Sequence, residues 1–187
     1  MNTTGIILAG GKSSRMGSDK GLLPFSGIPM IQHLIQELEQ LNLPILIISN
    51  NADYKRFGYP VIEDIIKEKG PVGGIYTALT ATSTEMNVIL SCDAPFVKKE
   101  LIKNLIDASE NHDVTVSSYN NKLHPLIGVY KKSSLNTFEE SLKNDQLRLR
   151  EVIDLLNTNI VDFSAESIDD RMFNNINTKD ELKELEI

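Results

Sequence analysis

Residues 8–23 read LAGGKSSRMGSDKGLL, and this stretch decides how the rest of the chain is interpreted. It follows a short apolar run, residues 5–8 (GIIL), which is typical of a buried strand. Gly10 and Gly11 form a turn after that strand, and glycines let backbone N–H groups approach an anion closely. Three cations that can bind phosphate follow in the same loop: Lys12, Arg15 and Lys20. We therefore expect a polyphosphate site here; the alternative is a glycine-rich turn with solvated lysines.

Two well-known phosphate loops do not match this stretch. A Walker A motif ending in Gly11-Lys12-Ser13 needs a glycine five positions before Gly11, where the chain has Ile6. The dinucleotide fingerprint G-x-G-x-x-G is also absent, because Gly10 and Gly11 are adjacent. The loop therefore belongs to another class of nucleotide site.

Composition indicates one globular domain that binds a small anion. The 187 residues, 41% hydrophobic and 24% charged, suffice for one well-cored domain over 1–187. The net charge of −7 argues against a broad nucleic-acid surface, although residues 1–28 carry a net +2. Cys92 is the only cysteine, so no intrachain disulfide can form. We find neither a secretory pattern nor an apolar run of membrane length, and we expect a cytoplasmic protein without a membrane partner.

The periodicity of the chain predicts an α/β fold. After Pro29, apolar residues recur at helical spacing (Ile31, Leu34, Ile35, Leu38 and Leu41), and a buried strand over residues 45–48 follows. Residues 65–74 are predicted to be a flexible loop that leads into a helix starting near Val72 to Ile75. Further strands are expected over 60–62, 87–91, 113–118, 123–130 and 159–163. The strands over 113–118 and 123–130 could pair antiparallel. Helices are expected over 98–109, 134–143 and 148–156. The prediction is a single-domain, mostly parallel twisted sheet with helices on both faces.

Polar residues follow several of these strands directly. Asn50 and Asp64 come after the second and third strands, and Asp93 comes after the strand over 87–91. In open α/β sheets, ligands bind outside the carboxyl ends of the strands, so these groups are expected to face one crevice with Gly10. Asp64 could accept hydrogen bonds from the N–H groups of guanine, or could simply place charge at the start of the following turn.

Asp93 is the predicted metal ligand. Mg²⁺ usually takes one or two carboxylates together with substrate phosphates. Pro95 turns the chain away and leaves the Asp93 carboxylate exposed in the crevice. The alternative role is a helix N-cap, but the next predicted helix begins several residues later.

These motifs together resemble the molybdenum cofactor guanylyltransferases, a family of GT-A-like nucleotidyltransferases. The matches run in order from Leu8 to Leu182: LAGG and DKGLL, VIED followed by GPVGG, CDAPF, His124-Pro125, and FNNINT at 173–178. The resemblance implies a Rossmann-like fold of the nucleotide-diphospho-sugar transferase type.

The resemblance also implies a reaction and a set of residues. GTP would be the donor, the terminal phosphate of molybdopterin the acceptor, Mg²⁺ the metal, and other cofactor-biosynthesis proteins partners. Arg15, Lys20 and Asp93 would be catalytic, with the metal on Asp93. The nucleotide would contact Leu8, Ala9, Gly10, Gly11, Lys12, Lys20, Asp64 and Asp93, and Asn50 or Ser49 would stand where the family has an asparagine.

The acceptor side is less sharply defined. The candidates are His124, Arg148, Asn175 and Asn177. Arg148 could instead form a salt bridge with Glu151 or Asp154, and Asn177 could cap the last helix.

Two other functions stay open from the residues alone. A sister transferase could use CTP with a pterin, a methylerythritol phosphate or a sugar, and no physical argument excludes CTP. A non-catalytic nucleotide-binding adaptor is the second alternative, and Asp93 argues against it because a sensor needs no metal carboxylate beside the phosphates.

Overall fold

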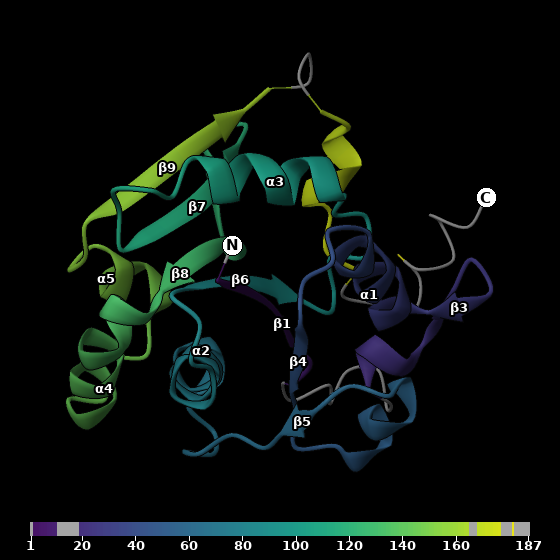
Figure 1. The fold of residues 1–187 in the computed structure, drawn as a ribbon, viewed down its shortest axis with the longest axis horizontal. Helices are drawn as coiled ribbons and strands as arrows, with labels where there is room; N and C mark the ends of the chain where they lie inside the picture. The colour runs from purple at the N-terminus through teal and green to yellow at the C-terminus, as the bar shows by residue number, and fades with distance from the viewer. Residues whose placement is uncertain (1, 11–18, 165–167, 177–180, 182–187) are drawn as a thin grey trace.

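The expected strands form one sheet. The structure, a computed structural model, describes residues 2–10, 19–164, 168–176 and 181. Its seven-stranded sheet has the order β5-β4-β1-β6-β8-β7-β9 (Figure 1). The strands are β1 (Thr3–Leu8), β4 (Ile45–Ile48), β5 (Val61–Ile62), β6 (Met86–Ser91), β7 (Val114–Tyr119), β8 (Lys122–Lys131) and β9 (Thr158–Phe163). Strands β5, β4, β1 and β6 pair in parallel, whereas β8 is antiparallel to both of its neighbours. The mostly parallel sheet and its antiparallel pair confirm the prediction.

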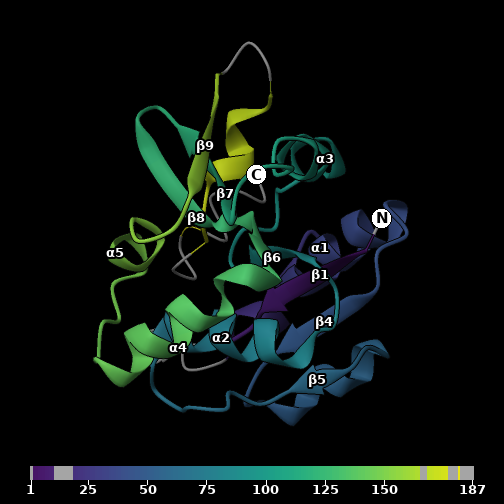
Figure 2. The ribbon, with the colours of Figure 1, turned by 60° about the vertical axis from the view of Figure 1, so that its left-hand side comes forward.

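Helices cover both faces of the sheet, as predicted (Figures 1 and 2). The buried side chains of α1 (Met30–Gln40) and α3 (Lys99–Asp107) share one core with Ile7 and Leu90. On the opposite face, α2 (Gly70–Ala81), α4 (Leu135–Lys143) and α5 (Leu149–Ile153) share a second core with Ile6 and Ile89. Successive side chains of a strand point to opposite faces, so each central strand contributes to both cores.

Helix α1 forms where its apolar spacing predicted it. Ile31, Leu34, Ile35 and Leu38 are all 0% exposed. Burying an aliphatic side chain of this size contributes about 1.5–3 kcal/mol each, so this stripe is what holds the helix on the sheet.

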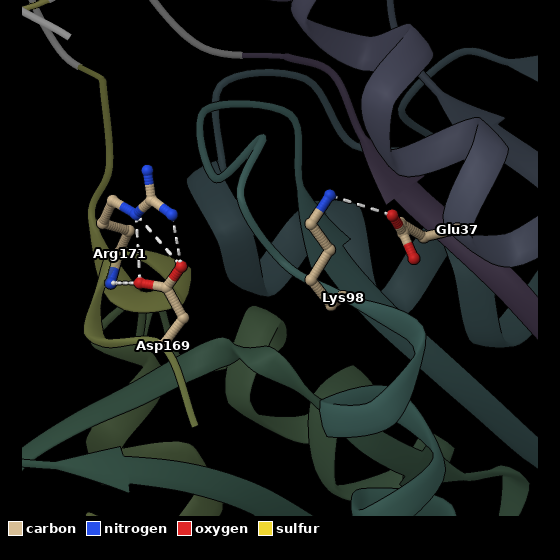
Figure 3. A network of polar contacts seen from close by, with 4 residues as sticks. All are labelled: Glu37, Lys98, Asp169 and Arg171. Carbon is tan, nitrogen blue, oxygen red and sulfur yellow. Dashed lines mark hydrogen bonds and ion pairs between the residues drawn. The ribbon is translucent and has the colours of Figure 1, made fainter. Parts of the chain in front are cut away.

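A carboxylate from α1 joins it to α3. Lys98, the N-cap residue of α3, makes no capping hydrogen bond with its own side chain. The nearly buried Glu37 takes that place: its Oε2 accepts from the Lys99 backbone N–H at 3.0 Å, and its Oε1 accepts from Lys98 Nζ at 3.0 Å (Figure 3). Negative charge is favourable at a helix N-terminus. A side chain distant in sequence therefore caps α3.

The GPVGG segment is helical, which corrects the prediction of a flexible loop over residues 65–74. Helix α2 begins at Gly70, and Pro71 lies in its first turn, where proline is tolerated because the N–H has no partner in the helix. A Cβ on Gly73 would lie 2.8 Å from Lys69 Cβ, and one on Gly74 would lie 3.5 Å from Leu8 Cδ2. Gly73 therefore allows a close approach that a side chain would prevent, whereas the contact at Gly74 is of ordinary length.

Several smaller features differ from the prediction or were not anticipated. Helix α5 ends at Ile153, not at Leu156, because the chain turns there into β9. The hairpin β2 (Pro24–Phe25) and β3 (Ile28–Pro29) has strands too short to show a period-2 pattern. The chain turns between β7 and β8 at Asn120 and Asn121, whose φ angles are 50° and 59°.

In the described part of the chain, no helix is long and apolar enough to cross a membrane. The longest helix in those ranges, α2, has 12 residues. About 20 are needed to cross a bilayer.

Candidate functional site

The parallel half of the sheet brings the predicted polar residues to one edge. Leu8 at the end of β1 pairs with Ile48 at the end of β4 and with Ser91 at the end of β6, and Ile48 pairs with Ile62 of β5. The residues just beyond these ends therefore lie along the same edge: Gly10, Ser49, Asn50, Asp64, Cys92 and Asp93. The expected gathering of site residues at the carboxyl ends of the strands is thus found.

Asp93 has an unsatisfied carboxylate oxygen. Its Oδ1 is buried and has no hydrogen-bond partner among the residues that the structure describes. Leaving a charged oxygen buried without a partner is costly, and such an atom in a native structure calls for a ligand or an ion. Its side chain makes no capping bond to α3, whose N-terminal N–H is taken by Glu37. The N-cap alternative for Asp93 is therefore wrong, and an oxygen ligand remains available.

Cys92 is buried, and charged side chains influence the pKa of its thiol. Burial is the largest cause that raises the pKa of its thiol; the negative charges of Asp93 and Asp19 raise it further, while Lys20 opposes them. A buried thiol with a raised pKa is a poor nucleophile. A Cβ on Gly21 would lie 3.2 Å from Cys92 Sγ, so the end of the loop that carries Lys20 lies beside the residue that precedes Asp93.

Asn50 and Asp64 form a reciprocal pair across β4 and β5. Asn50 Nδ2 donates to Asp64 Oδ2 at 2.8 Å, and the Asp64 backbone N–H donates to Asn50 Oδ1 at 3.1 Å. Partial burial is the main cause that raises the pKa of Asp64, and the hydrogen bond from Asn50 lowers it. The other oxygen, Oδ1, lies on the side of Gly74, 3.9 Å from where a Cβ would stand. One carboxylate oxygen is thus used to orient the group and the other faces the start of α2.

The first residues of the glycine loop combine a strand end with open space. The Leu8 carbonyl accepts from the Cys92 N–H at 3.1 Å, and the Ala9 N–H donates to the Ile48 carbonyl at 2.9 Å. Both residues are buried, so their side chains support the sheet. Gly10 is exposed, and a Cβ built on it would meet no atom within 4 Å in the described ranges. A ligand could therefore approach the backbone at Gly10.

The described segment that ends at Ile176 lies against the Asp93 turn. The Ile176 N–H donates to the Asp93 carbonyl at 2.8 Å, and Ile176 is fully buried with Phe25 and Met30. Its neighbour Asn175 is exposed. One acceptor candidate is thus anchored beside the metal candidate.

The other acceptor candidates are engaged elsewhere. His124 is nearly buried, its ring centroid lies 4.9 Å from that of Phe173, and burial lowers its pKa. Arg148 Nη1 forms the alternative salt bridge, at 3.0 Å from Glu151 Oε1, with 84% of its side chain exposed. A cavity of about 450 Å³ opens between β7, β8, β9 and the end of α5, and none of the predicted site residues lines it.

Four predicted residues cannot be placed. Gly11, Lys12, Arg15 and Asn177 lie outside the described residues. Conversely, sequence reasoning missed Tyr54 and Asn51, which donate to the Asp19 carboxylate beside Lys20. No sequence pattern links positions so far apart, although Asp19 stands inside the motif itself.

Comparison with known proteins gives one consistent result. Residues 5–160 match the family described as MobA-like NTP transferase domain. A probable molybdenum cofactor guanylyltransferase from Flavobacterium johnsoniae is 40% identical over 98% of this chain and 96% of its own. A molybdenum cofactor guanylyltransferase from Yersinia pseudotuberculosis is 34% identical over 95% of this chain and 91% of its own. Among solved structures, molybdopterin-guanine dinucleotide biosynthesis protein A from Archaeoglobus fulgidus superposes with a TM-score of 0.80 at 24% identity, covering 98% and 96% of the two chains, which supports the fold. The chain therefore belongs to the MobA-like NTP transferase family and, within it, to the molybdenum cofactor guanylyltransferases.

Proposed function

We propose that this chain transfers GMP from GTP to the terminal phosphate of molybdopterin and releases pyrophosphate. The observation that carries the proposal is the buried Oδ1 of Asp93, which has no partner among the described residues, at the edge of the sheet where Gly10 and Asp64 also lie. The names of the relatives supply the donor base and the acceptor. The whole chain, residues 1–187, is proposed to act as one nucleotidyltransferase domain in the cytoplasm.

The residues present fit Mg²⁺ as the metal. The unpartnered Asp93 oxygen is a hard ligand, and Mg²⁺ commonly uses one or two carboxylates and completes its shell with phosphates and water. Across the described ranges no cluster of three or more His, Cys, Asp or Glu side chains could hold a metal ion, which agrees with a metal shared with the substrate. When bound, Mg²⁺ would neutralise phosphate charge and orient the triphosphate.

Phosphate binding falls to the glycine loop in this proposal. No atom of the described residues would lie within 4 Å of a Cβ on Gly10, and Gly21, the residue after Lys20, lies against Cys92, which precedes Asp93. We propose that Lys20 stabilises the negative charge that develops on the leaving pyrophosphate, together with Lys12 and Arg15, while Gly11 completes the loop. Such a transfer depends on in-line positioning and charge stabilisation, so the buried Cys92 need not act as a nucleophile.

Base recognition is proposed for the Asn50–Asp64 pair. An ionised carboxylate only accepts hydrogen bonds, and guanine offers two neighbouring N–H donors on its Watson–Crick edge. Asn50 holds Asp64 by two hydrogen bonds, so the carboxylate is oriented before the base arrives. Cytosine lacks this pair of donors, which favours GTP over CTP.

The acceptor side is proposed to lie along residues 173–176. Ile176 ties this segment to the Asp93 turn and leaves Asn175 exposed next to it. An acceptor phosphate held there would approach the α-phosphorus from the side opposite the leaving pyrophosphate. Other cofactor-biosynthesis proteins would then receive the product, and neither a nucleic acid nor a membrane is required.

A nucleotide panel tests this proposal. The purified protein is heated with Mg²⁺ and GTP, CTP, ATP or UTP in turn, and the midpoint of unfolding is recorded. A ligand at about 100 times its Kd should stabilise the fold by about 2.7 kcal/mol. We expect GTP alone to raise the midpoint, followed by pyrophosphate release once molybdopterin is added. Stabilisation by CTP would overturn the guanylyltransferase in favour of a cytidylyltransferase, and GTP binding without turnover would favour an adaptor.

A further inference from the structure

The carboxylate of Asp19 is held by two side chains from the segment after β4. Tyr54 Oη donates to Asp19 Oδ1, and Asn51 Nδ2 donates to Asp19 Oδ2 at 3.2 Å. Asp19 is the N-cap residue of the short 3₁₀ helix Lys20–Leu22, yet its side chain makes no capping hydrogen bond there. An aspartate at this position ordinarily caps its own helix. Its carboxylate is instead committed to a tertiary contact.

Both donors are themselves fixed. Tyr54 is 0% exposed and belongs to the core beneath α1. Burial is the main cause that raises the pKa of its phenol, so the hydroxyl keeps its proton and remains a donor. Asn51 is held by its backbone N–H, which donates to Ser49 Oγ at 3.1 Å, and by its Oδ1, which accepts from the Asp53 N–H at 3.0 Å. The pair therefore forms a rigid support, which we name the Asp19 clamp (Asn51 and Tyr54).

Gly21 shows how tightly the loop end is docked against this support. A Cβ at Gly21 would lie 2.5 Å from Tyr54 Oη and 3.2 Å from both Cβ and Sγ of Cys92. Distances this short leave no room for any side chain. The backbone on both sides of Lys20 is thus pressed between the Asp19 clamp and the residue that precedes Asp93.

We infer that Tyr54 and Asn51 are positioning residues: by holding Asp19, they hold the neighbouring Lys20 at the phosphate site beside Asp93. The inference rests on the proposed function, because it assigns Lys20 to the triphosphate. Charge stabilisation depends on donors that are already placed when the reaction begins, so a loosened Lys20 would bind the nucleotide less well. A merely structural role would instead lower the stability of the fold and leave the kinetics of folded molecules unchanged.

A pair of matched variants distinguishes the two roles. Tyr54→Phe removes one tyrosine–carboxylate hydrogen bond at the Asp19 clamp, and Tyr59→Phe removes another of the same kind, to Glu39, away from the site. We expect Tyr54→Phe to lower kcat/KM for GTP about tenfold, mostly by raising KM, the loss expected for one hydrogen bond to a charged group. Tyr59→Phe should stay within about twofold of the unmodified protein. Equal kinetics in the two variants would overturn the inference.

A double variant and a conservative one sharpen the result. Tyr54→Phe combined with Asp19→Ala should be no worse than Asp19→Ala alone, because both changes remove the same contact. Asp19→Asn keeps an oxygen that can accept from Tyr54 and should recover part of the loss. Fully additive effects would show that Tyr54 and Asp19 act independently.

Amide hydrogen exchange measures how firmly the Asp19 clamp holds the loop end, without a catalytic assay. The N–H groups of Leu22 and Leu23 donate to the carbonyls of Asp19 and Lys20 at 3.1 and 3.0 Å. These amides should exchange about tenfold faster in Tyr54→Phe, and at an unchanged rate in Tyr59→Phe. If the unmodified protein turned over no nucleotide, the proposed function would fail, while unchanged exchange in Tyr54→Phe would sink the inference by itself.

Discussion

The two halves of the sheet treat their polar side chains differently. In the parallel half (β5, β4, β1 and β6), Asp93 has a buried carboxylate oxygen without a partner in the described ranges, and Asp64 directs only one of its oxygens to Asn50. In the other half (β8, β7 and β9), Arg148 is paired with Glu151 and His124 packs on Phe173. Thr115 Oγ1 in β7 is also buried without a partner among the described residues, but a carboxylate oxygen such as Asp93 Oδ1 costs more to leave unpaired than a neutral hydroxyl and so points more strongly to a ligand. The predictions below test this contrast.

The largest effect is expected at Asp93. Asp93→Asn removes the charge of the proposed metal ligand and should lower turnover by roughly 10³-fold or more, because a metal contributes several kcal/mol of charge stabilisation. The control is Asp154→Asn, an exposed aspartate after α5 in the other half, which should leave turnover unchanged. Circular dichroism should show both variants folded. Normal turnover in Asp93→Asn would remove the metal assignment.

Lys20→Ala should have the next largest effect. Loss of one preorganised donor to developing charge costs about 2.7–4 kcal/mol, or roughly 10²–10³-fold in turnover. GTP affinity, measured by calorimetry, should fall as well. Lys143→Ala removes an exposed lysine on α4 that pairs with Glu139 and serves as the control. Equal affinity for GTP in both variants would count against the glycine loop as the phosphate site.

Asp64 tests the recognition of the base. Inosine triphosphate lacks the exocyclic amine of guanine, so the unmodified protein should bind GTP more tightly than inosine triphosphate, by about tenfold for one hydrogen bond to a charged group. Asp64→Ala should weaken GTP binding and abolish this preference. Glu63→Gln alters the adjacent carboxylate, which pairs with Lys67 at 3.4 Å, and should retain the preference. A preference that survives in Asp64→Ala would move base recognition elsewhere.

A substitution of Arg148 is expected to have the smallest effect. A large effect would contradict the difference between the two halves of the sheet. Its salt bridge with Glu151 is exposed, and such pairs contribute about 0–1 kcal/mol. Arg148→Ala should therefore leave turnover within about twofold and stability nearly unchanged in urea unfolding. A tenfold loss of turnover without a loss of stability would show that Arg148 reaches the acceptor, and that the second half of the sheet also contributes to catalysis.

Much of the fold could be predicted from local patterns. The stripe from Ile31 to Leu38 and the apolar run over 45–48 predicted α1 and β4, because helices and strands bury side chains at fixed spacings. The start of α2 could not be predicted in this way. Its glycines suggest a loop by propensity, but the close approach of Gly73 to Lys69 and to the Ile66 carbonyl leaves no room for a Cβ, and tertiary context overrides propensity.

The candidate site was predictable as a set of positions, and its internal contacts were not. Gly10, Asn50, Asp64 and Asp93 each follow a strand, so topology alone predicted that they would share an edge. The pairing of Asn50 with Asp64 and the burial of the Asp93 oxygen depend on distances between separate segments. Glu37 illustrates the same limit, since nothing near Lys98 in the sequence indicates that a residue of α1 caps α3.

The sequence by itself determined the order of strands and helices, the glycine loop after β1, and the family, because these depend on residue spacing along one segment. Only the tertiary structure decided which polar groups are satisfied and which are left for a ligand. Hydrogen bonds such as those from Tyr54 and Asn51 to Asp19 join residues more than 30 positions apart. Those contacts follow from how the helices and strands pack, and packing is a property of the whole folded chain.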